Sequence, residues 1–411
     1  FGVGIGEASA SPAAFSLLSD SFPRERRATA LAVYSSGIYI GAGLGIGVGG
    51  VIVERWDAVF GSAPPFGLHG WQVAFFTVGL PGLLLAAWVA TLREPVRGAA
   101  DGIFTAAEPH PFRQFFFELR AVLPPLTLLH LIWIDAGLWR IALNVLAAIV
   151  IAAVAAGLTA LTHTAAQWIA LGVGVYAAIS WAQALGCRDP VAFELIFRSR
   201  ALRYSGLAFS FLAFLGYGIG FWVPPFFVRF HHVDERQAGL VLGALSALGG
   251  WLGITLGGVI ADAWRRVSPY GRLYVAISTA IVPVPIFLLL LTTESTPLAY
   301  ALVLPSSLFS SMWVGAGAST VQDLVLPRMR GVASAAYLLL VTFVGLALGP
   351  YTIGFLSVRL GDLREAMLAV IGANVLVLLF AALAVRHLVR EESSCLDRAR
   401  AAGEVLPIAT A

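Results

Sequence analysis

A charged stretch occurs twice in the chain, as SDSFPRERR at residues 19–27 and, in altered form, as QDLVLPRMR at residues 322–330. Each copy follows an apolar segment and leads into a glycine-rich apolar segment with an early tyrosine, Tyr34 or Tyr337. An acid, a proline and two arginines between apolar segments, repeated far apart, indicate a membrane protein built from two related halves. We therefore expect residues 1–92 to superpose on about 297–388, by a rotation about an axis along the membrane normal.

The composition is that of a membrane protein. The chain of 411 residues is 59% hydrophobic and only 12% charged, with a mean hydropathy of +0.85. A helix needs about 20 apolar residues to cross a bilayer. The gaps between charged residues predict 11 crossings, near residues 1–19, 29–53, 71–92, 141–161, 166–186, 204–228, 238–261, 273–293, 299–322, 331–357 and 366–385.

The basic residues orient these crossings. All 26 are arginine; 21 fall in one alternating set of loops and 5 in the other. The positive-inside rule places the richer set, and the C-terminal tail, in the cytoplasm, which suits a bacterial inner (plasma) membrane. The net charge of +3 reflects this bias rather than a nucleic-acid partner. Without lysine the chain cannot form a Walker-type ATP site, and we expect no cofactor.

The order of crossings predicts five parts. Residues 1–93 hold three helices of an N-terminal bundle. Residues 94–137 form a cytoplasmic linker with an amphipathic interfacial helix near 111–129. Residues 138–187 form an inserted transmembrane hairpin, because 47 residues without an acid, lysine or arginine separate Arg140 from Arg188. Residues 188–388 form a six-helix bundle, and 389–411 form the cytoplasmic tail.

Three motifs carry a family resemblance. Gly6-Glu7-Ala8, with Pro12-Ala13-Ala14 and FPRER at 22–26, is similar to the fourth-helix signature of the spinster-like branch of the major facilitator superfamily. GVIADAWRR at 258–266 resembles the superfamily's loop motif, without its basic residue directly after the acid or its glycine before the arginine pair. GLALGP at 345–350 resembles the eleventh helix. The resemblance implies an all-α integral membrane protein of that fold, truncated by about three N-terminal helices.

Glu7 is the only ionisable residue that lies clearly within a predicted crossing. A carboxylate in mid-membrane is costly, and it usually has a function. Burial would raise its pKa into a range where it binds and releases protons, so Glu7 is the predicted proton-coupling residue. The alternative is a structural glutamate permanently paired with an arginine.

The repeated loops predict a gate on the cytoplasmic face. Acids at helix ends can pair with arginines across that face in one conformation and release them in the other. The predicted gate residues are Asp20, Arg24, Arg26, Asp262, Arg265, Arg266, Asp323, Arg328 and Arg330. The alternative for the arginines is plain anchoring at the cytoplasmic surface.

Two further sets of residues have a predicted role. By resemblance, the helices equivalent to the family's seventh and tenth line a central cavity, which here implies Tyr217, Trp222, Ser310 and Trp313, with Ser311 and Gln322 beside them. Aromatic packing is the alternative for each. Gly37, Gly41, Gly45 and Gly49 repeat every four residues, as in helices that pack closely in lipid.

These patterns predict a secondary active transporter that moves a small amphipathic or organic-anion solute by alternating access, coupled to protons or another ion. We expect a monomer in contact with membrane lipids, and no metal site or enzyme activity. One rival is a membrane enzyme such as an acyl transferase, for which His231-His232-Val233-Asp234 is the single His/Asp cluster. The other is a non-transporting receptor or scaffold, which the duplication disfavours.

Overall fold

The computed structural model describes residues 2–61, 63–103, 109–123 and 126–404, apart from the side chains of residues 2–7, 9, 44, 46, 47 and 111. The described residues form helices joined by short loops, with no strand among them. The α-helices are α1 (Gly2–Ser21), α2 (Arg27–Phe60), α3 (Gly70–Val89), α4 (Pro111–Val122), α5 (Leu126–Trp133), α6 (Leu138–Thr162), α7 (Ala165–Arg188), α8 (Pro190–Ile196), α9 (Arg200–Phe230), α10 (Glu235–Val267), α11 (Gly271–Ile281), α12 (Pro283–Thr292), α13 (Thr296–Ser311), α14 (Trp313–Asp323), α15 (Arg330–Leu340), α16 (Gly349–Leu360), α17 (Leu363–Ile371), α18 (Asn374–Ser393) and α19 (Cys395–Ala401). Single-turn 3₁₀ segments are η1 (Arg24–Arg26), η2 (Pro65–Gly67), η3 (Ala99–Asp101) and η4 (Pro327–Met329), and η5 (Val341–Ala347) is a π-helix.

Ten helices in the described part of the chain are long and apolar enough to cross a membrane. Five of them are built from consecutive pieces, namely η1–α2, α11–α12, α13–α14, η4–α15–η5–α16 and α17–α18. Pro283 and Pro350 stand at the start of a new piece, because proline has no N–H to continue the helical hydrogen bonds. The prediction of an all-α integral membrane protein is confirmed.

The structure differs from the predicted crossings at two places. Within the predicted crossing at 1–19, the described residues 2–19 belong to helix α1, but α1 is not one of the ten long apolar helices, because serines and Glu7 lower its hydropathy. The predicted amphipathic helix at 111–129 is two helices, α4 and α5, bent by 116°. That bent pair is the remaining candidate for an eleventh crossing.

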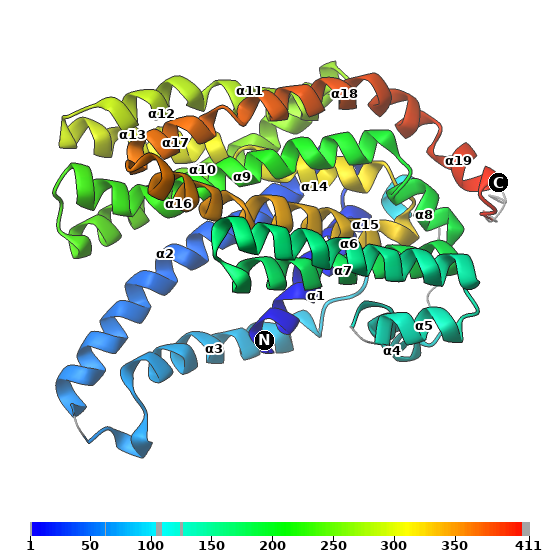
Figure 1. Ribbon diagram of the computed structural model, residues 1–411, viewed down its shortest axis with the longest axis horizontal. Helices are drawn as coiled ribbons and strands as arrows, with labels where there is room; N and C mark the ends of the chain where they lie inside the picture. Colours follow the sequence, from blue (N-terminus) through cyan, green and yellow to red (C-terminus); the bar gives the residue numbers. More distant parts are fainter. Residues whose placement is uncertain (1, 62, 104–108, 124–125, 405–411) are drawn as a thin grey trace.

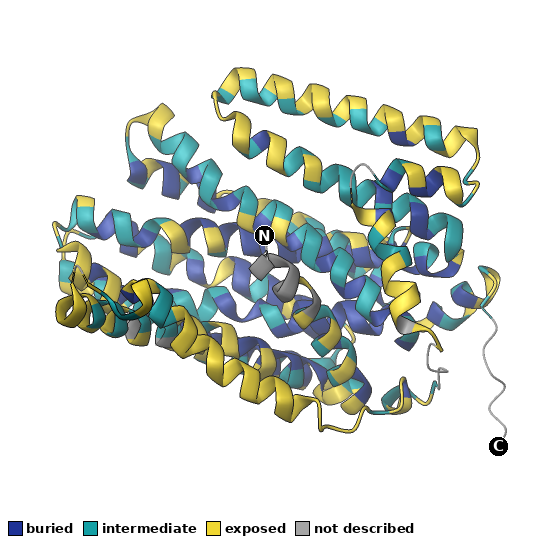
Figure 2. Ribbon diagram, turned by 90° about the horizontal axis from the view of Figure 1, so that it is seen from below, coloured by how far each residue is buried: buried dark blue, intermediate teal, exposed yellow. Residues whose placement is uncertain are grey.

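The helices run roughly side by side, with α9 in the middle, α2 packed against α10 and α3 diverging from the rest (Figure 1). Helix α9 is the most buried of the ten, because 61% of its apolar 18-residue stretch is buried inside the protein. Helix α3 has none of its corresponding apolar stretch buried, and Figure 2 shows its exposed face. An apolar exposed face is what contact with lipid requires.

Close helix packing uses several glycines of α10 and one of α2, Gly43, where a Cβ would lie 2.9 Å from the Ala247 Cβ. A Cβ on Gly253 would lie 2.0 Å from the Leu308 carbonyl oxygen, and Gly249 and Gly257 touch the α13–α14 backbone in the same way. On the neighbouring face of α10, Gly258 lies against Ala28 and Ala32 of α2. The predicted packing glycines of α2 meet no described atom within 4 Å: Gly37, Gly41, Gly45 and Gly49.

The hairpin of α6 and α7 packs on the flank of the protein, against η5 and α16. The Gln167 amide donates to the Ala347 carbonyl at 3.1 Å, and the Trp168 ring packs edge-on against Tyr351. Within the hairpin, buried Asn144 donates to Ser180 at 2.8 Å and to Gln183 at 2.6 Å. Figure 2 shows the hairpin at one edge, with much of its outer surface exposed.

Candidate functional site

The two copies of the charged stretch lie together at one end of the helices. In the first copy α1 ends at Ser21 and α2 begins at Arg27; in the second, α14 ends at Asp323 and α15 begins at Arg330. In both, a single 3₁₀ turn connects the helices, and the acid precedes the arginine by seven positions. We call the charged residues gathered here the ion-pair cluster: Asp20, Arg24, Arg27, Asp101, Asp262, Arg272, Asp323 and Arg330.

The acid of each copy pairs with the arginine of the other. Asp20 accepts a hydrogen bond from Nη1 of Arg330 at 2.6 Å, and Asp323 accepts one from Nη1 of Arg27. The Arg27 and Arg330 side chains are 0% and 1% exposed. These crossed pairs tie α1 and α2 to α14 and α15, which lie about 300 residues away in the sequence.

Asp101, in the loop after α3, joins both crossed pairs. Its carboxylate accepts from Nε of Arg24 at 2.9 Å, from Nη2 of Arg27 at 3.0 Å and from Nη2 of Arg330. The side chain is only 2% exposed. Burial by itself would raise the pKa of Asp101, but the charges of Arg27 and Arg330 outweigh it and lower that pKa to about 2. Asp101 is therefore ionised throughout the physiological pH range.

Asp262, at the end of α10, holds the start of α2. Its carboxylate accepts from the backbone N–H of Ala28 at 3.1 Å and of Thr29 at 2.7 Å, and from the Thr29 hydroxyl at 2.7 Å. The first N–H groups of a helix have no partner within the helix, and they carry partial positive charge, so an acid is stabilising there. Arg272 of α11 completes this side of the cluster by donating to Asp323 and to the Arg24 carbonyl oxygen.

The cluster contains four carboxylates and four guanidinium groups. Arg24 also lies 3.7 Å from a Glu392 carboxylate oxygen, and Glu392 pairs with Arg265, so the formal charges balance with this adjoining pair included. Balanced charge matters because removing one partner from a buried ion pair typically costs 3–5 kcal/mol. If α1 and α2 separated from α10, α14 and α15 at this end, every charged side chain of the ion-pair cluster would have to be hydrated. The arrangement can therefore hold the end closed in one conformation and release it in another.

The predicted gate residues fall into three groups. Asp20, Arg24, Asp262, Asp323 and Arg330 belong to the ion-pair cluster. Arg265 pairs with Glu392, and Arg328 pairs with Asp189 and Glu404, so both anchor the C-terminal region. Arg26 and Arg266 are exposed, and neither forms an ion pair with another described residue.

Sequence reasoning missed Arg27, Asp101 and Arg272. Alignment of the two stretches on their prolines matches Arg26 with Arg330. Alignment on the acids matches Arg27 with Arg330, because the first loop places its proline one residue nearer the acid than the second. The shared seven-residue spacing was therefore a signal for Arg27. Asp101 and Arg272 had no comparable signal, since each reaches the cluster from a separate loop or helix.

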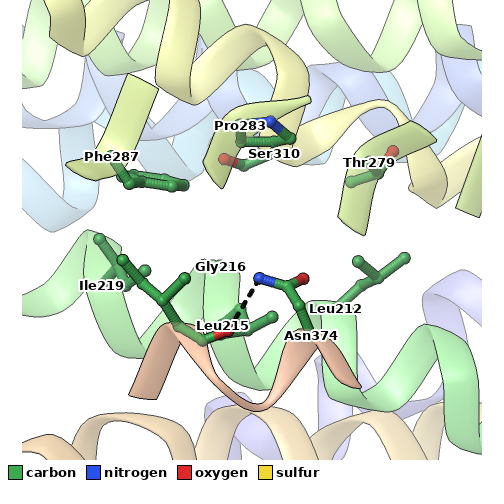
Figure 3. Close-up of a pocket in the computed structure, with 10 residues that line it drawn as sticks. Leu212, Leu215, Gly216, Ile219, Thr279, Pro283, Phe287, Ser310 and Asn374 are labelled. Carbon is green, nitrogen blue, oxygen red and sulfur yellow. Dashed lines mark hydrogen bonds between the residues drawn. The ribbon is translucent and has the colours of Figure 1, made fainter. Parts of the chain in front are cut away.

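The residues predicted to line a cavity have different surroundings. The hydroxyl of Ser310 bonds the Ser306 carbonyl oxygen, and Ser310 lines a cavity of about 20 Å³ together with Asn374 (Figure 3). That is room for about one water. Nε1 of Trp222 donates to the Pro350 carbonyl at 2.8 Å, and Tyr217 is 45% exposed.

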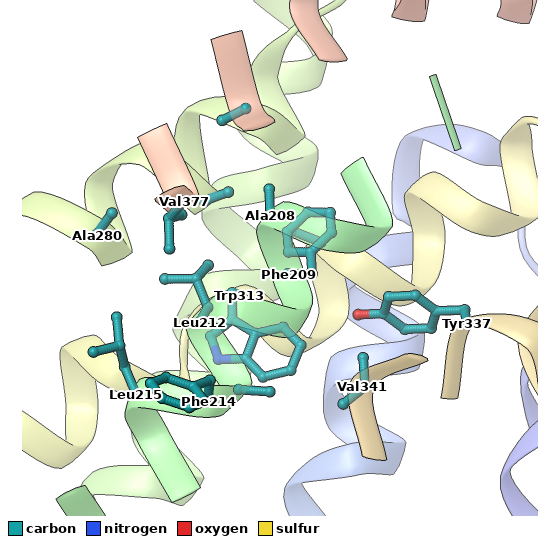
Figure 4. Packing of buried hydrophobic residues seen from close by; sticks show 14 of the residues in the cluster. Ala208, Phe209, Leu212, Phe214, Leu215, Ala280, Trp313, Tyr337, Val341 and Val377 are labelled. Atoms are coloured by element: carbon teal, nitrogen blue, oxygen red, sulfur yellow. The ribbon is translucent and has the colours of Figure 1, made fainter. Parts of the chain in front are cut away.

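Trp313 belongs to a buried aromatic group. Its ring stacks on Phe209 with the centroids 6.1 Å apart, and Tyr337 meets Phe209 edge-on (Figure 4). The Tyr337 hydroxyl and Oε1 of Gln322 are both buried without a hydrogen-bond partner among the described residues. Gln322 directly precedes Asp323, so unpartnered polar atoms lie close to the ion-pair cluster. Such atoms are usually satisfied by water or by a ligand.

Glu7 lies in α1, 13 residues before Asp20. At 1.5 Å per residue, its backbone is roughly 20 Å along the helix from the ion-pair cluster. The Glu7 side chain lies outside the described residues.

The comparisons with known proteins agree with this architecture. The family model described as Major Facilitator Superfamily matches residues 1–350. An "MFS-type efflux pump" of Mycolicibacterium smegmatis is 26% identical over 174 residues, which is 41% of this chain and 40% of that protein. Mouse "Protein spinster homolog 3" is 28% identical over 174 residues, or 39% of this chain and 34% of that protein. The matches thus span well under half the length of these curated relatives.

A solved structure shows a similar likeness at low identity. A bacterial homologue of the human lysosomal transporter spinster, in an inward-facing and occupied conformation, is 20% identical, with a TM-score of 0.47 over 95% of this chain and 76% of that one. The superfamily resemblance seen in the sequence is confirmed by the family match, and the relatives include spinster homologues.

Proposed function

Because this chain belongs to the Major Facilitator Superfamily, we propose that it is a secondary active transporter that works by alternating access. Its substrate is a small amphipathic molecule or organic anion, and protons drive its movement. The protein acts as a monomer in the bacterial inner membrane, with the ion-pair cluster at the cytoplasmic face.

The crossed ion pairs are the observation that carries this proposal. They are a closed contact between two groups of helices, built from two copies of one motif, as a gate between related halves requires. The orientation follows from the 21 arginines at this end of the helices, of 26 in the chain. Residues 1–93 and 188–388 are the two moving parts, and the hairpin at 138–187 is an accessory on the flank.

The substrate binds on the inner side of the gate. Arg330, Ser334 and Tyr337 lie at positions i, i+4 and i+7 of α15, so they share one buried face that leads inward from the cluster. The Tyr337 hydroxyl and the Gln322 amide oxygen offer unused hydrogen-bonding capacity on that path. Trp313 and Phe209 provide an apolar aromatic surface beside it. An amphipathic solute needs both kinds of contact.

Two members of the His/Asp cluster on which the rival enzyme hypothesis depends have structural partners, which favours the transporter. The Asp234 carboxylate accepts from the backbone N–H groups of Arg236 and Gln237, so it caps α10. His231 packs its ring on Phe226 and Phe227 and meets the Thr296 hydroxyl at 3.3 Å. The two side chains have separate structural partners, whereas a catalytic pair would bond to each other.

Glu7 is the proposed proton carrier. A carboxylate that is protonated on one side of the membrane and ionised on the other transmits about 1.4 kcal/mol per pH unit to the conformational equilibrium. Asp101 is less suited to this role, because the charges of Arg27 and Arg330 lower its pKa to about 2 in this conformation.

The test uses proteoliposomes with a pH-sensitive dye inside. A fluorescent lysophospholipid serves as the amphipathic probe and succinate as the anionic probe, each supplied with and without a pH gradient. The transported probe should accumulate only with the gradient and should carry protons with it. Glu7→Gln should abolish that accumulation while sparing substrate exchange. Full concentrative uptake by Glu7→Gln would remove the coupling role from Glu7, and no gradient-dependent movement of either probe would contradict the proposed transport.

A further inference from the structure

We propose that a groove between the α6–α7 hairpin and the C-terminal region binds one anionic phospholipid through its phosphate headgroup. The groove has a volume of about 960 Å³ and lies at the arginine-rich end of the hairpin. Its walls come from the beginning of α6, the end of α7, helix α8 and helix α19. Figure 1 shows these elements on the same side of the molecule as the C-terminus.

Three arginines give the groove its charge. Arg140 meets only the Cys187 sulfur and has no carboxylate partner in the described part of the chain. Arg198 forms an exposed pair with Glu194, the one acid that lines the groove. These two pairings leave most of the guanidinium donors free for a phosphate, whose oxygens match the fork of donors on arginine.

The third arginine, Arg398 of α19, has a shared partner. It lies 3.7 Å from a Glu391 carboxylate oxygen, and that carboxylate also accepts from the Ser199 hydroxyl and from the N–H of Arg200 at 3.1 Å. Nη2 of Arg398 also donates to the Glu391 carbonyl oxygen at 3.1 Å. The four charged residues that line the groove thus have a net positive charge.

The remaining lining is apolar and aromatic, as a lipid site requires. Trp139, in the first turn of α6, is 75% exposed, and tryptophan at a helix end is typical of the membrane–water boundary. Phe193 and Phe197 stack on each other beside it. Farther along α6, Leu146 and Ile149 are exposed, so acyl chains can follow the hairpin away from the headgroup.

The position and size of the groove favour a lipid over a soluble anion. Basic pockets beside membrane helices at the headgroup level bind anionic lipids, whose attraction is worth about a fivefold change in affinity per arginine. A single phosphate ion would fill only a small part of 960 Å³. The groove's apolar rings would then stay in water, whereas a phospholipid would cover them.

The experiment is native mass spectrometry of the full chain in uncharged detergent, titrated with phosphatidylglycerol, phosphatidylcholine or glycerol phosphate. We expect one phosphatidylglycerol per chain, retained in preference to phosphatidylcholine. Arg140→Gln with Arg398→Gln should weaken this binding roughly thirtyfold. Arg140→Lys with Arg398→Lys keeps the charge and should retain most of it, which separates loss of charge from misfolding.

Arg97→Gln with Arg113→Gln is the matched control, because both arginines are exposed and neither lines the groove. It should leave the binding unchanged. Equal retention of the two phospholipids, or equal loss in the control and in the groove variant, would overturn the proposal. Binding of glycerol phosphate as tight as that of phosphatidylglycerol would also overturn it, in favour of a soluble phosphate ligand.

Discussion

Asp101→Asn should open the arginine-rich end of the protein. The substitution keeps the size of the side chain but removes the one carboxylate that contacts Arg24, Arg27 and Arg330 together. The buried cluster then holds four guanidinium groups and three carboxylates. Loss of one partner from a buried pair costs about 3–5 kcal/mol, and the half-exposed Arg24 favours the lower value because water can hydrate it.

A loss of about 3 kcal/mol changes the ratio of closed to open forms by roughly a hundredfold. The change can be followed with spin labels at Arg26→Cys and Arg266→Cys, since both positions are exposed and belong to the two groups of helices that the cluster joins, η1 beside α2 and α10. Cys187 and Cys395 would first be replaced by alanine. In nanodiscs, the distance distribution should gain a longer component when Asp101→Asn is introduced.

Two further variants make this experiment decisive. Asp397→Asn removes an exposed acid, whose side chain is 78% exposed, and should leave the distances unchanged. Asp101→Asn with Arg24→Gln restores the balance of charge and should recover part of the closed population. If Asp101→Asn gave the wild-type distribution, the ion-pair cluster would not be what holds this end closed.

Three other perturbations test separate parts of the structure. Gly253→Ala places a methyl group 2.0 Å from the Leu308 carbonyl oxygen, so thermal unfolding should show a loss of about 1–3 kcal/mol, whereas Gly243→Ala, with open space around it, should be neutral or stabilising. The contribution of Asp101 to the free energy of unfolding is fully present above pH 3.8 and is lost as the pH falls towards 2, because the pKa of Asp101 is lower in the folded state than in the unfolded state. A fall in stability that began near pH 6 would exclude Asp101 as its cause. Asn144→Leu removes the polar contacts between α6 and α7 and should weaken the hairpin by about 1–2 kcal/mol, seen as faster proteolysis of its loop; unchanged proteolysis would show that apolar packing alone holds the pair.

Features that depend on residues close together in the sequence could be predicted, whereas contacts between distant segments could not. Helix positions came from local hydropathy, and ten of the predicted crossings match long apolar helices. Asp20 and Arg330 could be proposed as gate residues because the motif repeats. Their pairing with each other depends on how two distant loops meet, and the role of Asp101 depends on where a third loop folds back. Neither relation leaves a pattern in a single sequence.

The glycines show the same limit. A four-residue repeat of small side chains predicts that a helix can be approached closely, but not which helix approaches it. Gly37 and Gly41 of α2 face open space, whereas Gly253 of α10, at the same four-residue spacing from Gly249 and Gly257, lies against a neighbouring backbone. Spacing therefore predicted the capacity for close packing, and only the tertiary arrangement shows where it is used.

The division of charge within the cluster has a consequence for membrane voltage. The α1–α3 region, with its following loop, contributes Asp20, Asp101, Arg24 and Arg27; helices α10 to α15 contribute Asp262, Asp323, Arg272 and Arg330. Each side is thus electrically neutral. An electric field across the bilayer does work on net charge, at about 2.3 kcal/mol per charge per 100 mV. The free energy of separating these two neutral surfaces should therefore depend very little on the membrane voltage. Attraction between two neutral arrays also falls off faster with distance than attraction between ions, so the proposed gate would be held strongly when closed and would attract only weakly once the two surfaces have separated.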